Sequence, residues 1–574
     1  TATLPEGLKK GINYHQDDTQ VTLVLEAPGK DFAYVVGDFT DWQIQAEYLM
    51  NQTPDGELFW LEINGLTPSQ QYVFQYWVDE TIKIADPYAE LIADPWNDQY
   101  ITEEIYPNLF SYDRTDYGIA SVLQTAQEAY VWSDSENTWQ APAKENLVIY
   151  ELLVRDFVDS HYYQDVIDSL DYLKRLGVNA IELMPVMEFE GNSSWGYNTS
   201  YSFAADKYYG TKDDLKKLIE TAHQKGIAVI LDIVLNHHFG QSALVQMYWD
   251  ASTGTVSEDS PWFNPIATHP FNVGFDFNHE SSYTKNFVDS VNRYWVDEFH
   301  VDGYRFDLSK GFTQTDYGDD ITAWSSYDAG RVALLKRMAD KLWAYDSEAI
   351  IILEHFGAAS EETELANYGN GMLLWRGMSG FYAQALIGAG GDISGANAST
   401  HVSFMESHDE ERQGYEMIEF GVSSGDYDVQ NELIMMERAK MGSAFHFLQP
   451  GPKMIWQFGE LAYDISINQE GRLGEKPEPW GSEGLGYYED TYRQYVFDAY
   501  SAILELRNEN IDALTEGTFS SSLSGSLKQI TIDHTDFKMC IIGNFGTETN
   551  TITANFPELG DWFDYFTGES MELE

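Results

Sequence analysis

"DDLKKLIETAHQKGIAVILDIVLNHH", residues 213–238, joins a predicted helix to a predicted buried strand. The first half is expected to be helical and to end at Gly226, because glycine is the residue that most often follows the last turn of a helix. The second half is a continuous apolar run, which is typical of a parallel strand covered on both faces. A helix that leads directly into such a strand is the repeating unit of α/β folds.

The same alternation continues in both directions along the chain. "NLVIYELLV" (146–154) precedes a helical stretch, "DVIDSLDYLKRLG" (165–177), and the strand-like run "NAIELMPV" (179–186) follows it. Further runs of the strand type lie at 301–308, 349–356, 371–375, 401–409 and 452–460. Eight such strands, most of them separated by helices, predict a (β/α)8 TIM barrel over residues 145–508, with a subdomain inserted at about 238–280.

The remainder of the chain is predicted to be β-structure. Residues 1–100 hold short β-rich runs such as "VTLVLEAP" (21–28), separated by turn formers, which predicts an N-terminal β-sandwich. Residues 101–144 are interpreted as a linker, and the β-rich runs within 509–574 predict a small C-terminal β domain. The expected fold class is therefore α/β, with a TIM barrel between two β domains.

The charge balance excludes several kinds of partner. Asp and Glu number 93 against 33 Lys and Arg, which gives a formal net charge of −60. Such a chain repels nucleic-acid backbones and anionic membranes, and we expect a strongly acidic surface that suits saline water. No apolar run of about eighteen residues is present, so no membrane span is expected. The single cysteine, Cys540, excludes an intrachain disulfide.

Polar and charged residues recur at the ends of the predicted barrel strands. Because a TIM barrel carries its active site at the C-terminal ends of its strands, these residues should surround one cavity. They are Asp232, Asn236 and His237; Arg305, Asp307 and Lys310; Glu354 and His355; and Glu406, His408 and Asp409. Paired carboxylates indicate cleavage of a glycosidic bond, in which one acid protonates the leaving oxygen and the other attacks or activates water. A metal hydrolase is the competing interpretation, although no His-Glu-x-x-His or Cys-x-x-Cys spacing supports it.

Four of these strand ends resemble the signature regions of the α-amylase superfamily, glycoside hydrolase family 13. The similar stretches, in that family's order, are "DIVLNH" (232–237), "GYRFDLSK" (303–310), "ILEHF" (352–356) and "FMESHD" (404–409). "WGYNTSYSFAADKYYGTKDDLKKLI" (195–219) resembles the family's strand-two loop and the helix after it. The N-terminal "VVGDFTDWQ" (35–43) resembles carbohydrate-binding module family 48.

The resemblance implies a double displacement that retains the anomeric configuration. By their places in these regions, Asp307 is the expected nucleophile, Glu354 the general acid/base, and Asp409 a third carboxylate that stabilises the transition state. Arg305 is expected to keep Asp307 ionised, since a neighbouring guanidinium lowers the pKa of a carboxylate. The residues expected to contact substrate are Tyr197, Asp232, His237, Arg305, Lys310 and His408.

The resemblance also bears on metals. Asn236 matches the family's calcium-ligand asparagine, whereas Gly311 stands where many members have a histidine whose carbonyl helps to bind Ca²⁺. Calcium is the one metal that the resemblance implies, with Asn236 as its candidate ligand. No organic cofactor is expected.

Three functions remain open from the sequence. The first is an α-amylase that cleaves α-1,4-glucosidic bonds of starch or related α-glucans. The alternative is an α-1,6-acting or transferring member of the superfamily, such as a pullulanase, cyclomaltodextrinase or branching enzyme, and a minor alternative is a non-catalytic glucan-binding protein. The expected partner is an α-glucan or a maltooligosaccharide, and the oligomeric state is not predicted. Because starch is a polymer and the chain begins at Thr1, we expect an enzyme that works outside the cytoplasm after loss of a leader or lipid-anchor segment.

Overall fold

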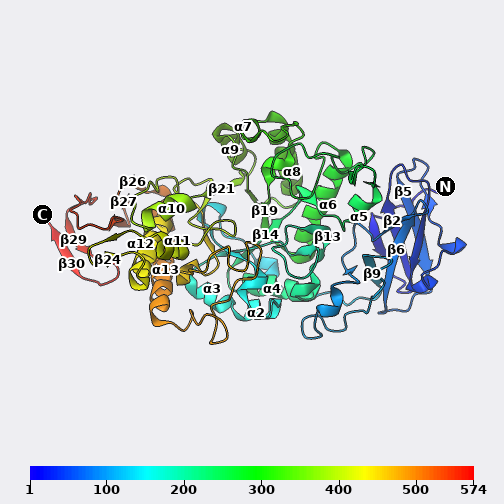
Figure 1. Cartoon of the computed structure of the whole chain (residues 1–574), viewed down its shortest axis with the longest axis horizontal. Coiled ribbons are helices and arrows are strands. Elements are labelled where there is room, and N and C mark those ends of the chain that lie inside the picture. The colour runs from blue at the N-terminus through cyan, green and yellow to red at the C-terminus, as the bar shows by residue number, and fades with distance from the viewer.

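The computed structural model describes residues 1–574 and arranges them in three parts along one long axis (Figure 1). The N-terminal β domain lies at one end, the barrel in the middle and the C-terminal sheets at the other end, so the two termini are far apart. None of the helices combines the length and the apolar character that a membrane crossing requires.

The middle part is a closed barrel of parallel strands, which confirms the predicted TIM barrel. The strands follow one another around the barrel in sequence order, and the last pairs in parallel with the first. They are β10 (Val148–Leu152), β11 (Ala180–Leu183), β14 (Ala228–Ile233), β19 (Gly303–Phe306), β20 (Ile350–Leu353), β21 (Leu373–Gly377), β22 (His401–Phe404) and β25 (Lys453–Trp456).

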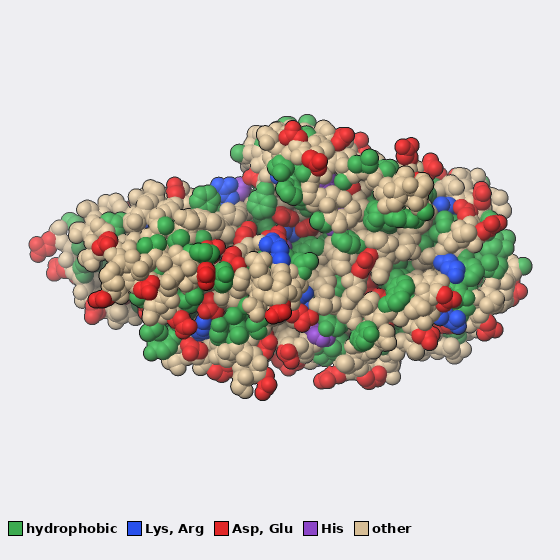
Figure 2. All heavy atoms as spheres, in the orientation of Figure 1, with side chains coloured by type: hydrophobic (Ala, Val, Ile, Leu, Met, Phe, Trp, Pro, Cys, Tyr) green, Lys and Arg blue, Asp and Glu red, His purple; other side chains and the backbone are tan.

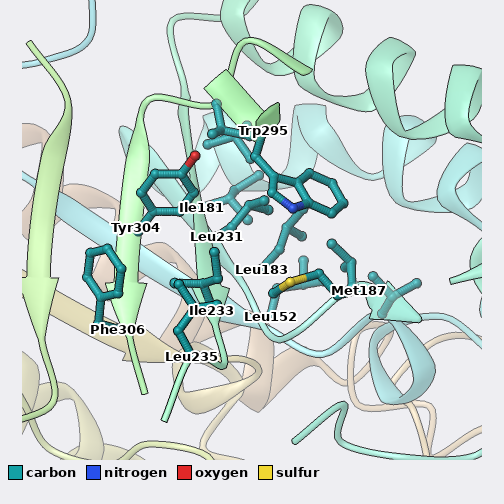
Figure 3. Packing of buried hydrophobic residues seen from close by; sticks show 14 of the residues in the cluster. Leu152, Ile181, Leu183, Met187, Leu231, Ile233, Leu235, Trp295, Tyr304 and Phe306 are labelled. Carbon is teal, nitrogen blue, oxygen red and sulfur yellow. The ribbon is translucent and has the colours of Figure 1, made fainter. Parts of the chain in front are cut away.

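Alternation along each strand separates an inner face of the barrel from an outer face. On β14, Ala228 and Ile230 belong to a cluster of 12 buried residues drawn mainly from the barrel strands. Leu231 and Ile233 instead belong to the large outer cluster, in which Leu231 lies near Trp295 of the surrounding helices (Figure 3). Asp232 follows Ile230 by two residues and therefore lies on the inner face, above the apolar layer. The same period places charged residues on the inner face of the neighbouring strands, at Glu151, Glu182, Arg305 and Glu354.

Helices surround the barrel, and their ends follow local sequence signals. Thr211 begins α4 with a capping box, since its Oγ1 accepts from Asp214 N at 3.1 Å while the Asp214 carboxylate accepts from Thr211 N at 2.9 Å. The helix predicted over 165–177 is divided in two at Ser169. The helices are α1 (Val154–Phe157), α2 (Tyr163–Asp168), α3 (Leu170–Leu176), α4 (Lys212–Gln224), α5 (Ala243–Met247), α6 (Ser282–Phe299), α7 (Ile321–Trp324), α8 (Ala329–Tyr345), α9 (Ala359–Ala366), α10 (Ser379–Leu386), α11 (Gln413–Phe420), α12 (Glu432–Phe447), α13 (Thr491–Glu509) and α14 (Ile511–Glu516).

The N-terminal domain consists of two antiparallel sheets and extends further along the chain than predicted. One sheet has β1 (Gly11–Tyr14), β2 (Gln20–Glu26), β5 (Leu58–Asn64) and β4 (Asn51–Gln52); the other has β3 (Ala33–Gly37), β6 (Gln71–Val78), β9 (Ala120–Gln124) and β8 (Ile92–Ala93), with β7 (Ile82–Ile84) on β6. β9 falls inside the 101–144 segment that we interpreted as a linker, and it pairs with β6 and β8. That interpretation is wrong for residues 120–124, whose backbone completes a sheet of the sandwich.

Two tryptophans of this domain are covered by the same segment. Trp42 is buried, and its ring lies 4.9 Å from that of Tyr117, while Trp77 stacks on Tyr117 at 5.7 Å. Arg114 lies over Trp42 at 4.9 Å. Trp42 therefore packs within the domain, and the half-buried Trp77 packs against Tyr117 of the same chain.

Short β elements complete the insertions and the C-terminus. A hairpin after β11 has β12 (Met187–Phe189) and β13 (Thr199–Ala205), and the excursion after β14 holds β15 (His237–His238), β16 (Trp249–Asp250), β17 (Thr255–Val256) and β18 (Phe275–Asp276). β23 (Ser423–Ser424) pairs with β24 (Tyr427–Asp428). The C-terminal sheets are β26 (Thr518–Ser522), β27 (Leu527–Asp533) and β28 (Lys538–Asn544), and β29 (Gly560–Phe563) with β30 (Ser570–Leu573).

Candidate active site

Arg305 occupies the centre of the charged layer at the mouth of the barrel. Its Nη1 donates to Asp232 Oδ1 and to Asp307 Oδ1, both at 2.9 Å, and its Nη2 lies 3.1 Å from Glu354 Oε2. The guanidinium has no solvent exposure and lies 4.1 Å from the ring centre of Trp375. One buried cation therefore contacts three carboxylates from three adjacent strands.

The two carboxyl groups expected to react are shifted to different pKa values. Burial raises the pKa of Asp307 to about 6 despite the opposing charge of Arg305, with a further rise from Asp232. Burial also raises the pKa of Glu354 to about 7, again against Arg305 and with a contribution from Asp307. We expected Arg305 to keep Asp307 fully ionised. Arg305 does lower the pKa of Asp307, but burial raises that pKa by more. One guanidinium is shared among three acids, which limits its effect on each.

Backbone contacts between two adjacent strand ends fix the position of Glu354. Its Oε2 accepts from Leu308 N at 2.7 Å, and its carbonyl accepts from Ser309 N at 3.0 Å. Leu308 (φ 44°) and Phe356 (φ 49°) both adopt left-handed backbone, which is unusual for large side chains and occurs where a site constrains the chain. Phe356 is 45% exposed two residues beyond Glu354, so it presents an aromatic face at the mouth of the barrel.

His408 is held as a cation beside the charged layer. Its Nδ1 lies 2.5 Å from Glu151 Oε1, and its Nε2 lies 3.0 Å from the hydroxyl of Tyr197, which in turn donates to Asp232 Oδ2 at 2.6 Å. Burial lowers the pKa of His408, but the carboxylates of Asp409 and Glu151 outweigh burial and raise it to about 10. The ring of Tyr197 stacks on His408 at 5.1 Å.

Asp409 lies at the solvent side of this group. Its Oδ2 is 3.5 Å from His408 Nε2, and its Oδ1 accepts from Arg472 Nη2 at 2.9 Å. Burial raises its pKa, but His408, Arg305 and Arg472 outweigh that effect and hold it below the usual value. The structure thus brings Asp307, Glu354 and Asp409 to one end of the barrel around two buried cations.

Comparisons with known proteins identify the family that the chain resembles. The family model "Alpha amylase, catalytic domain" matches residues 162–273. A malto-oligosyltrehalose trehalohydrolase of Saccharolobus solfataricus is 35% identical over 33% of this chain and 32% of its own length, and a 1,4-alpha-glucan branching enzyme of Salinibacter ruber is 26% identical over 76% of this chain and 70% of its own. The chain belongs to the α-amylase superfamily.

Solved structures of this superfamily share the fold of nearly the whole chain. A putative alpha amylase from Salmonella typhimurium matches with a TM-score of 0.68 at 18% identity, covering 98% of each chain. A pullulanase from Anoxybacillus sp. LM18-11 matches with a TM-score of 0.69 at 18% identity, covering 99% of this chain and 86% of its own. At this identity the likeness concerns the fold.

Two of the residues expected to contact substrate form hydrogen bonds to backbone carbonyls of the protein. His237 is fully buried, and its Nε2 lies 2.9 Å from the carbonyl oxygen of Tyr197. Lys310 lies in the short helix η7 (Ser309–Phe312), donates from Nζ to the carbonyl of Phe356 at 3.0 Å, and rests on the ring of Trp324 at 4.0 Å. Contact of either side chain with a sugar stays a prediction.

Two other residues of the predicted ring turn away from the site. His355 pairs through Nε2 with Glu361 at 2.7 Å, and Glu406 accepts from the backbone N of Gln413 at 2.8 Å. Both are buried and serve the loops that follow their strands.

Binding of calcium by Asn236 stays a prediction. Its Oδ1 is buried and has no hydrogen-bond partner, but the groups next to it are Gly311 and the imidazole of His269. A Cβ at Gly311 would lie 2.1 Å from Asn236 Oδ1 and 2.7 Å from His269 Nε2, so only glycine allows this packing. Calcium requires six to eight oxygen ligands. No group of three or more His, Cys, Asp or Glu side chains in the chain is arranged to hold a metal.

Sequence reasoning missed four residues that build the site. Glu151 fixes His408, Glu182 lies beside them with both oxygens buried and unpartnered, Trp375 supports Arg305, and Arg472 contacts Asp409. Glu151 and Glu182 were detectable, since each is the one charged residue within an apolar strand, "NLVIYELLV" and "NAIELMPV". Arg472 lies in an irregular loop without a pattern.

Proposed function

We propose that this protein is a retaining enzyme of α-glucans, with Asp307 as nucleophile, Glu354 as general acid/base and Asp409 as the third carboxylate. The observation that carries the proposal is the shared contact of Arg305 with Asp307 and Glu354, whose pKa values differ. Retaining glycosidases need two carboxyl groups close together, one ionised and one protonated. The guanidinium holds the two carboxyl groups close together, while burial and the charge of Asp307 keep the proton on Glu354 to a higher pH.

The proposed reaction has two steps. Asp307 attacks the anomeric carbon while Glu354 gives its proton to the oxygen of the leaving sugar, which produces a glycosyl-enzyme ester. Glu354, now a carboxylate, then takes a proton from the attacking acceptor, and the bond to Asp307 breaks. Water as acceptor gives hydrolysis, and a sugar hydroxyl gives transfer.

Among the superfamily's activities we favour the α-1,6-acting or transferring class. Support comes from the relatives: 1,4-alpha-glucan branching enzymes recur among the curated proteins that match this chain, and a pullulanase has the same fold over 99% of it. The α-1,4 hydrolase is the second candidate, supported by the putative alpha amylase that matches from end to end. A non-catalytic role is disfavoured because Asp307, Glu354 and Asp409 are all present and lie at one end of the barrel. We also propose maltooligosaccharides as ligands and a location outside the cytoplasm.

The first experiment removes the nucleophile. Asp307→Asn should lower kcat on soluble glucans by about 10³-fold or more, because an amide cannot form the glycosyl-enzyme. Its circular dichroism and Tm should match those of the wild type closely enough to exclude unfolding. Activity within tenfold of wild type would refute the catalytic assignment.

The second experiment separates the two classes by product. Wild-type enzyme is incubated with pullulan, amylose and cyclodextrins. Maltotriose from pullulan, or new branches in amylose, is expected for the α-1,6-acting or transferring class. Short maltooligosaccharides from amylose with little action on pullulan would instead establish the α-1,4 hydrolase.

A further inference from the structure

Arg472 reaches the active site from the loop between the short helix η8 (Gly459–Leu461) and α13. Its Nη2 lies 2.9 Å from Asp409 Oδ1 and donates to the carbonyl oxygen of Asp409 at 2.7 Å. Both side chains are about half exposed, at 48% for Arg472 and 44% for Asp409. The contact therefore lies at the open side of the site, where substrate must enter.

The loop on either side of Arg472 is attached to the barrel. The buried side chain of Arg155 donates from Nη1 to the carbonyl of Leu473 at 3.0 Å and from Nη2 to that of Gly474 at 3.1 Å. Asp156 fixes this guanidinium, since its Oδ1 accepts from Arg155 Nε at 2.7 Å. The backbone after Arg472 is thus held by the first βα junction of the barrel.

A second attachment precedes Arg472. Glu411, two residues after Asp409, accepts from Ile467 N at 2.8 Å and from Ser466 Oγ at 2.7 Å. Arg472 consequently has little freedom to leave Asp409 by movement of the whole loop.

The two oxygens of Asp409 face different cations. Oδ1 is held by Arg472, and Oδ2 lies 3.5 Å from His408. Without Arg472, a half-exposed aspartate would be free to turn its carboxylate toward water, because only the longer contact would remain.

We propose that Arg472 is a positioning residue that orients the carboxylate of Asp409 for the transition state, and that Arg155 acts through it. The proposal rests on the catalytic role proposed above for Asp409. Arg472 need not touch the reacting atoms. Its effect is to keep one oxygen of Asp409 occupied so that the other faces the bound sugar.

The test compares Arg472→Met, Arg472→Lys and Arg155→Met with the control Arg293→Met. Arg293 lies on α6, is exposed and pairs with Asp297, so its loss should leave kcat and KM unchanged. Arg472→Met should lower kcat on the order of tenfold with KM within about twofold, because the lost interaction acts in the transition state. Arg472→Lys should recover part of this loss, and Arg155→Met should reproduce it more weakly.

Two further measurements exclude a merely structural role. In Arg472→Met both limbs of the kcat/KM profile should stay where they are, since they belong to Asp307 and Glu354, whereas a loosened site would lose burial and move them. Adding Asp409→Asn to Arg472→Met should cost less than Asp409→Asn alone, as expected of two residues acting as a unit. Unchanged kcat, or fully additive losses, would overturn this inference while an inactive Asp307→Asn left the proposed function intact.

Discussion

At the scale of single residues, one guanidinium at the site contacts three carboxyl groups and does not offset the effect of burial on their pKa values. Arg305 contacts Asp232, Asp307 and Glu354, all withdrawn from water, and burial raises the pKa of each. Because Glu354 retains its proton to a higher pH than Asp307, the pair holds one ionised and one protonated group between about pH 6 and pH 7. A retaining glycosidase uses that combination.

The pH dependence of activity should reflect this pair. We expect kcat/KM to follow a bell with limbs near pH 6 and pH 7, the lower from Asp307 gaining a proton and the upper from Glu354 losing one. The limbs belong to the coupled pair. Initial rates on a soluble maltooligosaccharide from pH 4 to pH 9 provide the measurement. Glu354→Gln should abolish the upper limb of any residual activity, and a flat profile above pH 8 would contradict the assignment.

Glu182 permits a test of burial that is separate from catalysis. It has no exposure, neither oxygen has a partner, and burial together with Glu151 raises its pKa well above the usual value. An acid whose pKa is raised by folding costs stability once the pH exceeds its unfolded value, and the cost grows until the folded pKa is reached. Glu182→Gln should therefore raise the free energy of unfolding, by about 1–3 kcal/mol at pH 8 and by less at pH 4.

Urea unfolding of this variant at several pH values measures the effect. The exposed Glu348→Gln serves as the matched control and should follow the wild type at each pH. A gain for Glu182→Gln that is equal at pH 4 and pH 8 would show that ionisation is not its cause.

The residues of the charged layer were predictable to different degrees. A period of two along a strand already puts Asp232, Arg305 and Glu354 on one face, and similarity to known motifs assigned roles to them. Glu151 and Glu182 obey the same period, but nothing in one sequence distinguishes a charged residue that orients a histidine from one without a partner. Those differences come from contacts between strands far apart in sequence.

At the scale of elements, residues 130–141 form a strap that packs against the barrel strands. Trp139 packs against the inner cluster and stacks on His223 of α4 at 4.4 Å, and Trp132 stacks on His300 at 4.0 Å. Glu136 of the strap lies 3.1 Å from His223 Nδ1, and the opposite nitrogen lies 3.0 Å from Asp302. The strap therefore depends on a buried imidazole between two carboxylates.

This contact predicts a pH-dependent stability. Burial lowers the pKa of His223, but Asp302 and Glu136 outweigh it and raise the pKa above its usual value. A histidine whose pKa is raised by folding contributes stability below its unfolded pKa and loses that contribution as the pH rises through the folded value. His223→Gln should lower the free energy of unfolding by about 1–3 kcal/mol at pH 6 and by less at pH 9.

Thermal unfolding at both pH values measures this loss, and limited proteolysis within residues 125–146 locates it. His534→Gln, in the β27–β28 hairpin, is the control. Equal destabilisation by His223→Gln at pH 6 and pH 9, or protection of the strap in the variant, would contradict the ionic role.

Strand prediction succeeded for the apolar runs of the barrel and failed for β9, which lies in a polar stretch. The eight barrel strands are apolar because they are covered on both faces, so the runs were visible without their partners. β9, "ASVLQ" (120–124), has five residues in a polar stretch. It is a strand because its backbone pairs with those of β6 and β8. The strap likewise has no periodic pattern, since its order comes from aromatic and ionic contacts with the barrel.

At the scale of the whole molecule, the charge of −60 is spread over the surface. Figure 2 shows Asp and Glu side chains over the length of the visible face, with Lys and Arg much fewer. Buried cations such as Arg305 and Arg331 are already paired with buried acids, so they do little to neutralise the negative charge of the surface. Repulsion among surface carboxylates therefore opposes the compact state at low ionic strength.

Salt should consequently stabilise this protein. Raising NaCl from about 0.1 M to 1 M shortens the Debye length from about 10 Å to about 3 Å, which screens repulsion between surface carboxylates but reaches buried pairs such as Arg305–Asp307 much less. We expect Tm to rise by several degrees and activity to persist in molar NaCl, because the ion pairs of Arg305 in the candidate site are withdrawn from water. Differential scanning calorimetry and initial rates over the same salt series measure both.

Because a rise in Tm could also come from exclusion of any solute, sucrose of equal osmolality is the control and should raise Tm less. A Tm that falls with NaCl, or activity lost by 1 M, would mean that the acidity is not matched to saline water.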